Sequence, residues 1–140
     1  MGRERNDRFM KGILLISHGE MAKGMVDSIS LFFGNLKQLD YLCLKKEDNP
    51  EQFRQLMIEK IKALDSGEGV IILADILGGT PCNQSAYVIS DNVVVLTGMN
   101  LGMLISIMSA RQGQTIDIEM VLNDGKMGIN CLNDLLGVKK

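Results

Sequence analysis

The chain has a single histidine, and it stands where the sequence changes from an apolar run to a helical pattern. His18 lies between Ser17 and Gly19, and Ser17 directly follows the apolar residues 13–16. A neutral imidazole can attack phosphorus through one ring nitrogen when a carboxylate holds the proton on the other. Asp75 ends another strongly apolar run and is the candidate for that carboxylate. Together, the two residues could carry a phosphoryl group.

A glycine-rich segment follows Asp75 and could bind the phosphoryl oxygens. Gly78 and Gly79 allow backbone N–H groups to converge on an anion, and Thr80 opens a helix whose positive end faces the same place. Each feature alone has a structural explanation: a lone histidine is more often structural, a Gly-Gly turn meets a backbone requirement, and Asp75 could cap the next helix. Their combination favours function. We therefore expect His18 and Asp75 to be catalytic, and Gly78, Gly79 and Thr80 to bind phosphate, with no metal site.

The elements that must position these residues alternate along the chain. Apolar runs predict strands at residues 12–16, 39–44, 70–74 and 93–97, and polar–apolar alternation predicts an edge strand at residues 115–120. Helical spacing or capping signals predict helices between these strands and a last helix that follows Asn123-Asp124-Gly125. The segment Thr97-Gly98-Met99-Asn100 closes the fourth strand and is a third place where polar residues follow a strand.

This alternation predicts one α/β fold: an open, mostly parallel sheet of about five strands with helices on both faces. The last strand, residues 115–120, is expected to lie antiparallel at the edge. Residues 1–10 are expected to form a flexible leader, and residues 11–140 a single domain. In such sheets ligands bind beyond the carboxyl ends of the strands, where the strand order reverses. His18 and Asp75 both follow predicted strands at such ends.

Composition excludes several classes of partner. The formal net charge is −2, from 15 basic and 17 acidic residues, which gives no electrostatic footprint for nucleic acid or an anionic membrane. No apolar segment reaches the ~18–20 residues that span a bilayer, so direct membrane insertion is not expected. Three widely spaced cysteines without metal-ligand spacing indicate a reducing, cytoplasmic location: Cys43, Cys82 and Cys131.

Four segments resemble the mannose-type IIA domain of the bacterial phosphoenolpyruvate-dependent sugar phosphotransferase system (PTS). They are ISHGEMAKGM, ILADILGGTPCNQSA, GMNLGMLISIM and DGKMGINCL, and the resemblance covers residues 11–136. It implies a phosphohistidine carrier, in which His18 accepts phosphate from the histidine phosphocarrier protein HPr and passes it to a IIB component during sugar uptake. Asp75 would pair with His18, and Thr80 would lie near the phosphoryl group.

The resemblance also implies a homodimer that exchanges its last strand, here residues 115–120, and it implies no cofactor. One position departs from the family pattern. Gly102 stands in a segment where the family commonly has proline, and glycine would leave the neighbouring loop more mobile. We expect this departure to affect the choice of partner more than the phosphorylation chemistry.

Other functions remain to be weighed. The same fold could supply phosphate to a dihydroxyacetone kinase or act as a regulator in another non-transport pathway, with His18 and Asp75 unchanged. A histidine phosphatase would need an arginine at residue 17 and a second histidine, and the sequence has neither. A flavodoxin-like cofactor binder is poorly supported, because the chain has few aromatic residues and no G-x-G-x-x-G turn.

Overall fold

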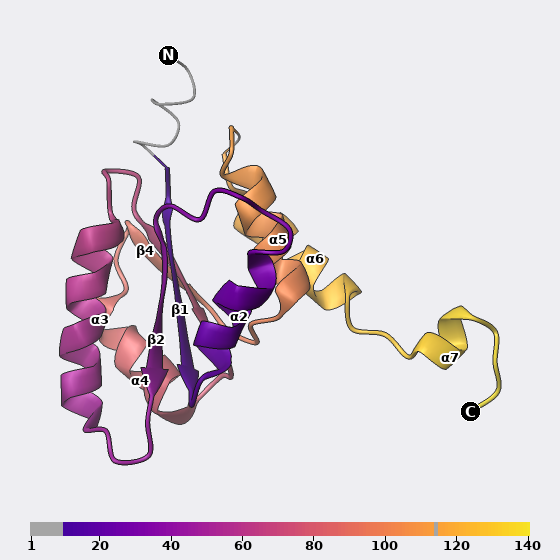
Figure 1. The fold of residues 1–140 in the computed structure, drawn as a ribbon, viewed down its shortest axis with the longest axis horizontal. Helices are drawn as coiled ribbons and strands as arrows, with labels where there is room; N and C mark the ends of the chain where they lie inside the picture. Colours follow the sequence, from indigo (N-terminus) through magenta and orange to yellow (C-terminus); the bar gives the residue numbers. More distant parts are fainter. Residues whose placement is uncertain (1–9, 114) are drawn as a thin grey trace.

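The computed structural model describes residues 10–113 and 115–140, in which strands and helices alternate (Figure 1). The strands are β1 (Gly12–His18), β2 (Leu39–Leu44), β3 (Val70–Ala74) and β4 (Val93–Leu96). The helices are α2 (Met21–Ile29), α3 (Pro50–Leu64), α4 (Gly79–Ser85), α5 (Leu101–Ala110), α6 (Ile118–Met127) and α7 (Leu132–Leu135). A short 3₁₀ helix, η1 (Ala86–Val88), continues α4.

The four strands form one parallel sheet in the order β2-β1-β3-β4. Parallel pairing joins β1 to both of its neighbours, with Ser17 beside Cys43 and Ile16 beside Ala74. This confirms the predicted α/β class with a parallel sheet. From β1 the chain turns to one side to form β2, and it then crosses to the other side to form β3. The strand order therefore reverses between β1 and β3.

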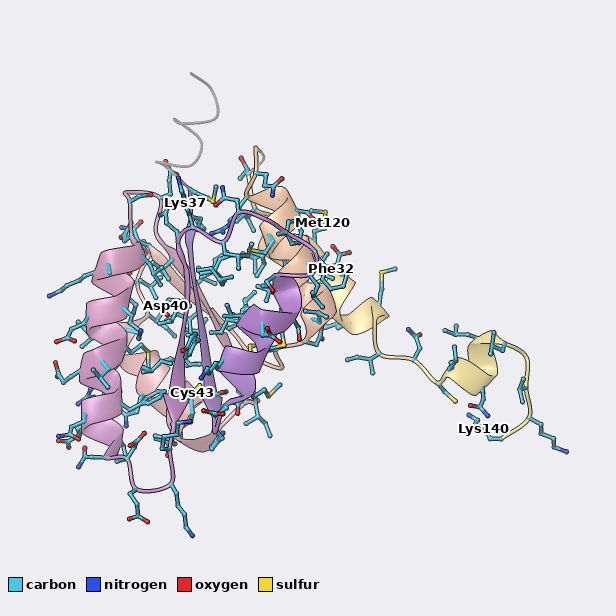
Figure 2. All side chains as sticks on the ribbon, in the orientation of Figure 1. Phe32, Lys37, Asp40, Cys43, Met120 and Lys140 are labelled. Atoms are coloured by element: carbon cyan, nitrogen blue, oxygen red, sulfur yellow. The ribbon has the colours of Figure 1, made fainter. Side chains whose placement is uncertain are left out.

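Helices cover both faces of the sheet: α2, α5 and α6 on one face, and α3 and α4 on the other (Figure 1). Successive side chains of β1 point alternately to the two faces of the sheet and pack under the helices on each face. Ile13 and Leu15 pack in the cluster beneath α2 and α5, whereas Leu14 and Ile16 pack beneath α3. Figure 2 shows side chains filling the space between the sheet and both helix layers. A strand buried on both faces needs a continuous apolar run, which is why β1 and β3 show one.

Side-chain caps set where two of the covering helices begin. The Asn49 side chain accepts hydrogen bonds from the backbone N–H groups of Glu51 and Gln52, and Pro50 occupies the first turn of α3. The Asn100 side chain accepts from the N–H of Met103 at 2.9 Å at the start of α5. Such caps satisfy N–H groups that have no partner inside the helix. They place both helices without help from the residues around His18.

The predicted edge strand at residues 115–120 is wrong, because residues 115–117 are not in a strand and residues 118–120 begin helix α6. The Asp117 side chain accepts from the N–H groups of Glu119 and Met120 and so begins a helix. Val121 is then buried, and a Cβ at Gly125 would lie 3.2 Å from the Met103 Cβ, so α6 packs closely on α5. Residues 123–125, predicted to turn, lie within α6. An acidic cap outweighed a short alternating pattern.

The two ends of the described chain also differ from expectation. The predicted leader, residues 1–10, lies outside the described residues except for Met10. Met10 is buried, and its carbonyl accepts hydrogen bonds from Gln38 Nε2 at 2.8 Å and Ser66 Oγ at 3.0 Å, so it belongs to the folded part. At the other end, residues 128–140 are exposed throughout and extend away from the sheet (Figure 1).

Candidate functional site

His18 and Asp75 meet at the reversal of strand order. His18 is the last residue of β1, and Asp75 directly follows β3. These are neighbouring parallel strands, so their carboxyl ends reach the same edge of the sheet, at the lower side of Figure 1. The crevice at such a reversal is where open α/β sheets bind ligands. The topology therefore brings together two residues that are 57 positions apart.

One oxygen of the Asp75 carboxylate contacts two nitrogens of His18, one in the backbone and one in the ring. The backbone N–H of His18 donates to Asp75 Oδ2 at 2.9 Å, and the ring Nδ1 lies 2.8 Å from the same oxygen. The carboxylate can only accept, so it selects the tautomer that carries the proton on Nδ1. Nε2 then has a free lone pair. The Asp75 side chain is 10% exposed and that of His18 is 49% exposed, so the imidazole is accessible while the carboxylate is shielded.

The electrostatics of the pair favour an ionised Asp75. Burial acts to raise the pKa of the Asp75 carboxyl, but it is outweighed by the hydrogen bonds from the His18 backbone and ring, by the charge of His18, and by the N–H of Ile76. The pKa therefore lies below its usual value. Asp75 is thus an anion at neutral pH, as the tautomer argument requires.

Gly79 lies directly against the free side of the imidazole. A Cβ at this position would be 2.7 Å from His18 Cε1 and 3.1 Å from Nε2, closer than side chains pack. Its φ of +75° also belongs to the left-handed region that favours glycine. From the sequence we explained this glycine by the need for backbone N–H groups to approach a phosphate. The structure adds a steric reason: any side chain would push the ring away from its present position.

The helix that begins at this glycine has no side-chain cap. Gly78 occupies the N-cap position of α4 with φ +79°, and no side chain accepts hydrogen bonds from the first turn. The helices α3, α5 and α6, by contrast, are each capped by an Asn or Asp side chain. Thr80 lies half-buried in this first turn. Gly79 therefore lies against His18 with Gly78 and Thr80 on either side of it in the chain, and the N-cap residue supplies no side-chain oxygen to the N–H groups of this turn.

Ser17 is a positioning residue that the sequence analysis did not identify. It is fully buried, and its Oγ donates to the Gly19 carbonyl at 3.1 Å and accepts from the Ala22 N–H at 2.8 Å. The hydroxyl thus ties the turn after His18 to the first residues of α2. A serine at a strand-to-helix junction is a signal for such a turn, but the sequence does not show which atoms it joins.

The third strand end proposed from the sequence has a structural role. Met99 is buried, and Asn100 is committed to α5, whose first turn it caps. The Asn100 amide also donates to the Gly125 carbonyl at 3.2 Å and so links the start of α5 to α6. These contacts account for the polar residue at this strand end. The candidate phosphoryl site is therefore formed at the carboxyl ends of β1 and β3 alone.

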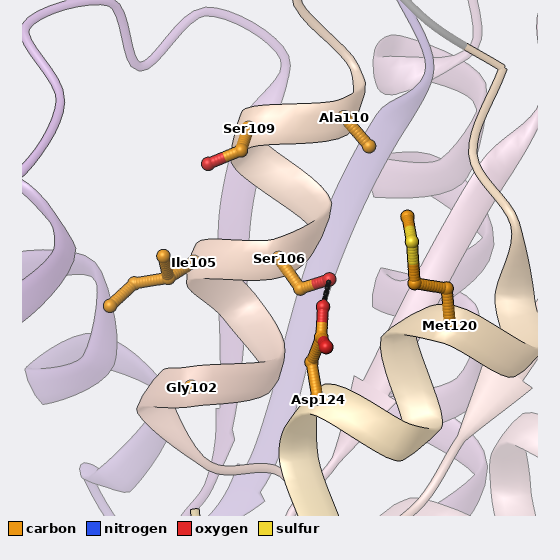
Figure 3. A pocket seen from close by; sticks show the side chains of 7 residues that line it. All are labelled: Gly102, Ile105, Ser106, Ser109, Ala110, Met120 and Asp124. Carbon is orange, nitrogen blue, oxygen red and sulfur yellow. Dashed lines mark hydrogen bonds between the residues drawn. The ribbon is translucent and has the colours of Figure 1, made fainter. Parts of the chain in front are cut away.

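A separate cavity of about 400 Å³ lies between α5 and α6 (Figure 3). Within its lining the Ser106 Oγ donates to Asp124 Oδ2 at 2.6 Å (Figure 3). Gly102, the position that departs from the family pattern, lines this cavity inside the first turn of α5, where Asn100 already caps the helix. The lining consists of Gly102, Ile105, Ser106, Ser109, Ala110, Met120 and Asp124. It shares no residue with the His18 site.

Among residues 10–113 and 115–140, no group of three or more His, Cys, Asp or Glu side chains is arranged to hold a metal ion. In the same part of the chain, none of the helices has the length and apolar character needed to cross a bilayer. All three cysteines are free thiols, with Cys131 exposed and Cys43 and Cys82 half-buried.

Sequence comparison identifies similar proteins. The model of the family described as "PTS system fructose IIA component" matches residues 12–124. The mannose-specific EIIAB component of the Escherichia coli phosphotransferase system is 24% identical over 125 residues, which cover 86% of this chain but only 39% of that protein. The fructose-specific EIIA component of Bacillus subtilis is 25% identical over 105 residues, covering 74% of this chain and 72% of the relative.

Structure comparison points the same way. The crystal structure of a PTS IIA protein associated with the fucose utilization operon of Streptococcus pneumoniae superposes with a TM-score of 0.84. It is 28% identical in sequence, and the match covers 91% of this chain and 97% of that one. The fold and the His18 site thus occur in a chain similar to phosphotransferase-system IIA proteins along nearly its whole length.

Proposed function

The chain belongs to the family of PTS fructose IIA components, and on this premise we propose that it is a phosphohistidine carrier in sugar uptake. His18 accepts a phosphoryl group from HPr and passes it to a IIB component. The observation that carries this proposal is the 2.8 Å contact between His18 Nδ1 and Asp75 Oδ2, which leaves Nε2 free beside Gly79.

Each residue of the site has a task in this transfer. Nε2 of neutral His18 attacks phosphorus, and the bond from phosphorus to the donor nitrogen breaks as the new bond forms. The ring becomes positively charged while Nδ1 keeps its proton, and the Asp75 carboxylate stabilises that charge. The N–H groups of Gly78, Gly79 and Thr80 bind the phosphoryl oxygens. After transfer, the negative charge of Asp75 near the phosphoryl group keeps the group easy to pass on.

The named relatives favour transport over the alternative role in dihydroxyacetone phosphorylation or regulation. They are described as mannose- and fructose-specific components of the phosphotransferase system. This chain spans only 39% of the length of the Escherichia coli EIIAB component. We therefore propose the IIB partner and the role in sugar uptake and do not take them over from that relative. We place the protein in the cytoplasm, in agreement with its three free cysteines.

The proposal includes a homodimer, formed by a segment other than the one first expected. Residues 118–120 lie in α6, so residues 115–120 cannot be exchanged as a strand. The segment after α6 is better suited, because it extends away from the sheet with its large apolar side chains exposed (Figure 2). A second copy would bury that surface. The exposed apolar residues are Ile129, Leu132, Leu135, Leu136 and Val138.

Incubation with phosphoenolpyruvate, enzyme I and HPr tests the proposed function. The protein should gain one phosphoryl group that is labile in acid and stable in base, as expected of phosphohistidine. His18→Ala should gain none. Retention of phosphorylation in His18→Ala would refute the assignment, and so would a wild-type protein that HPr cannot phosphorylate.

A further inference from the structure

Two exposed aliphatic residues separate Asp75 from the glycines of the site. Ile76 is 56% exposed and Leu77 is 77% exposed. Single apolar residues on a protein surface are common and need no explanation. These two are adjacent in the chain, and they follow directly on the carboxylate that orients the nucleophile. Neither belongs to the buried core, so the fold does not account for their apolar character.

Hydrogen bonds hold this pair in a fixed relation to His18. The Asp75 N–H donates to the Ile16 carbonyl at 3.1 Å, which continues the pairing of β3 with β1. The Ile76 N–H donates to Asp75 Oδ1 at 2.9 Å, while Oδ2 of the same carboxylate binds His18. One side chain therefore orients both the imidazole and the loop that carries Ile76.

The Ile76 side chain borders the same space as the reactive nitrogen. A Cβ at Gly79 would lie 3.1 Å from His18 Nε2 and 3.9 Å from Ile76 Cγ2, so both atoms face one small volume above Gly79. Two charged residues lie just beyond neighbouring strand ends, Glu20 after β1 and Lys45 after β2, and they bind each other: Lys45 Nζ lies 2.9 Å from Glu20 Oε1. The rim beside Nε2 is therefore apolar on the side of β3.

We propose that Ile76 and Leu77 are the apolar docking contact for phosphorylated HPr, the protein that donates the phosphoryl group to His18. The inference rests on the proposed function and names the surface through which it acts. In transfer between two imidazoles, reacting atoms must approach to about 3–3.5 Å. A folded partner that brings the phosphorus on its imidazole so close to Nε2 must cover Ile76. A small phosphorylated molecule could reach Nε2 and leave both side chains in water.

The transfer itself is balanced without a further reactant. The bond between phosphorus and the partner's ring nitrogen breaks, and its electron pair stays on that nitrogen. The bond between phosphorus and His18 Nε2 forms from the His18 lone pair. The positive charge moves from the partner's ring to the ring of His18, and no proton leaves either protein. Ile76 and Leu77 contribute to the approach of the two proteins and to no bond.

Kinetics with two phosphoryl donors test the docking contact. Ile76→Ser and Leu77→Ser should each lower kcat/KM for transfer from phosphorylated HPr roughly tenfold, because a buried aliphatic anchor is lost from an interface. The rate with potassium phosphoramidate, a small donor that releases ammonia, should stay close to wild type. Leu77→Met, which keeps an apolar side chain of similar volume, should retain the HPr rate.

A matched control and three adverse outcomes complete the test. Leu31→Ser alters a side chain that is 86% exposed near the end of α2 and should leave both rates unchanged. Transfer from HPr within about twofold of wild type in both serine variants would overturn the docking contact alone. An equal loss with phosphoramidate would also overturn it, because the residues would then shape the imidazole. If HPr cannot phosphorylate the wild-type protein, the proposed function fails as well.

Discussion

A single carboxylate oxygen, Asp75 Oδ2, accepts hydrogen bonds from both the backbone N–H and the ring Nδ1 of His18, at 2.9 and 2.8 Å. The backbone contact fixes where the ring is attached, and the ring contact fixes its rotation and tautomer. Because both contacts use one oxygen, the other oxygen is free to bind the Ile76 N–H. The orientation of the imidazole and the shape of the loop beside it therefore depend on the same side chain.

Replacement of Asp75 by asparagine should slow phosphorylation without unfolding the protein. Asparagine has the same size but can present an N–H group to Nδ1, which would favour the wrong tautomer. We expect a roughly 10²–10⁴-fold loss in the rate of transfer from phosphorylated HPr, measured by rapid quench. Asp65→Asn is the control, since Asp65 accepts from the N–H groups of Gly67 and Gly69 and does not touch His18. Transfer within a few-fold of wild type in Asp75→Asn would reduce Asp75 to a structural role.

The stability contributed by Asp75 should depend on pH in a defined direction. Burial raises the pKa of Asp75, but the hydrogen bonds and charge of His18 lower it by more than burial raises it. The folded-state pKa therefore lies below that of the unfolded chain. The contribution is therefore complete above roughly pH 4 and is lost as the pH falls through the folded-state pKa. Urea unfolding of wild type and Asp75→Asn should show a difference in unfolding free energy that is constant near neutrality and shrinks in acid. A difference that grows on acidification would contradict the assigned shift.

A methyl group at position 79 should inactivate the site by displacing the ring. Gly79→Ala would place Cβ 2.7 Å from His18 Cε1, so the imidazole must move away from Asp75 or the loop must shift. We expect at least a roughly tenfold slower phosphorylation, since small misplacements of a reacting group are costly. Gly98→Ala is the matched control, because Gly98 has φ +74° and no atom within 4 Å of the added Cβ. Equal losses in the two variants would show that backbone strain alone is responsible.

The C-terminal segment should hold the proposed homodimer together. Leu132, Leu135 and Leu136 are 63%, 65% and 67% exposed, and their replacement by aspartate should shift the protein from dimer to monomer in sedimentation at micromolar concentration. Charged groups cannot be buried at an apolar interface without a partner. Leu56→Asp, at a half-exposed position of α3, should remain dimeric. A wild-type protein that sediments as a monomer would exclude this assembly.

The meeting of His18 and Asp75 could be predicted from the sequence because both residues are marked locally. His18 and Asp75 each follow an apolar run long enough to be a buried strand, and parallel strands in an alternating pattern place their carboxyl ends at one edge. The need for glycine at residues 78 and 79 follows from the tight strand-to-helix turn. The 2.8 Å contact itself could not be predicted, because a sequence does not state the register between strands or the rotation of a ring.

The sequence by itself determined the elements whose signals are continuous: the buried strands, the helices capped by Asn49 and Asn100, and the positions of His18, Asp75 and Gly79 at the ends of strands. Tertiary structure decided the rest. Residues 115–120 alternate like a strand, yet Asp117 caps a helix, and that helix is favoured because Val121 and Gly125 pack against α5. A six-residue alternation is compatible with either structure, so the available packing surface selects between them. Ser17 likewise acquired its role only when the turn after His18 brought the Gly19 carbonyl and the Ala22 N–H to its hydroxyl.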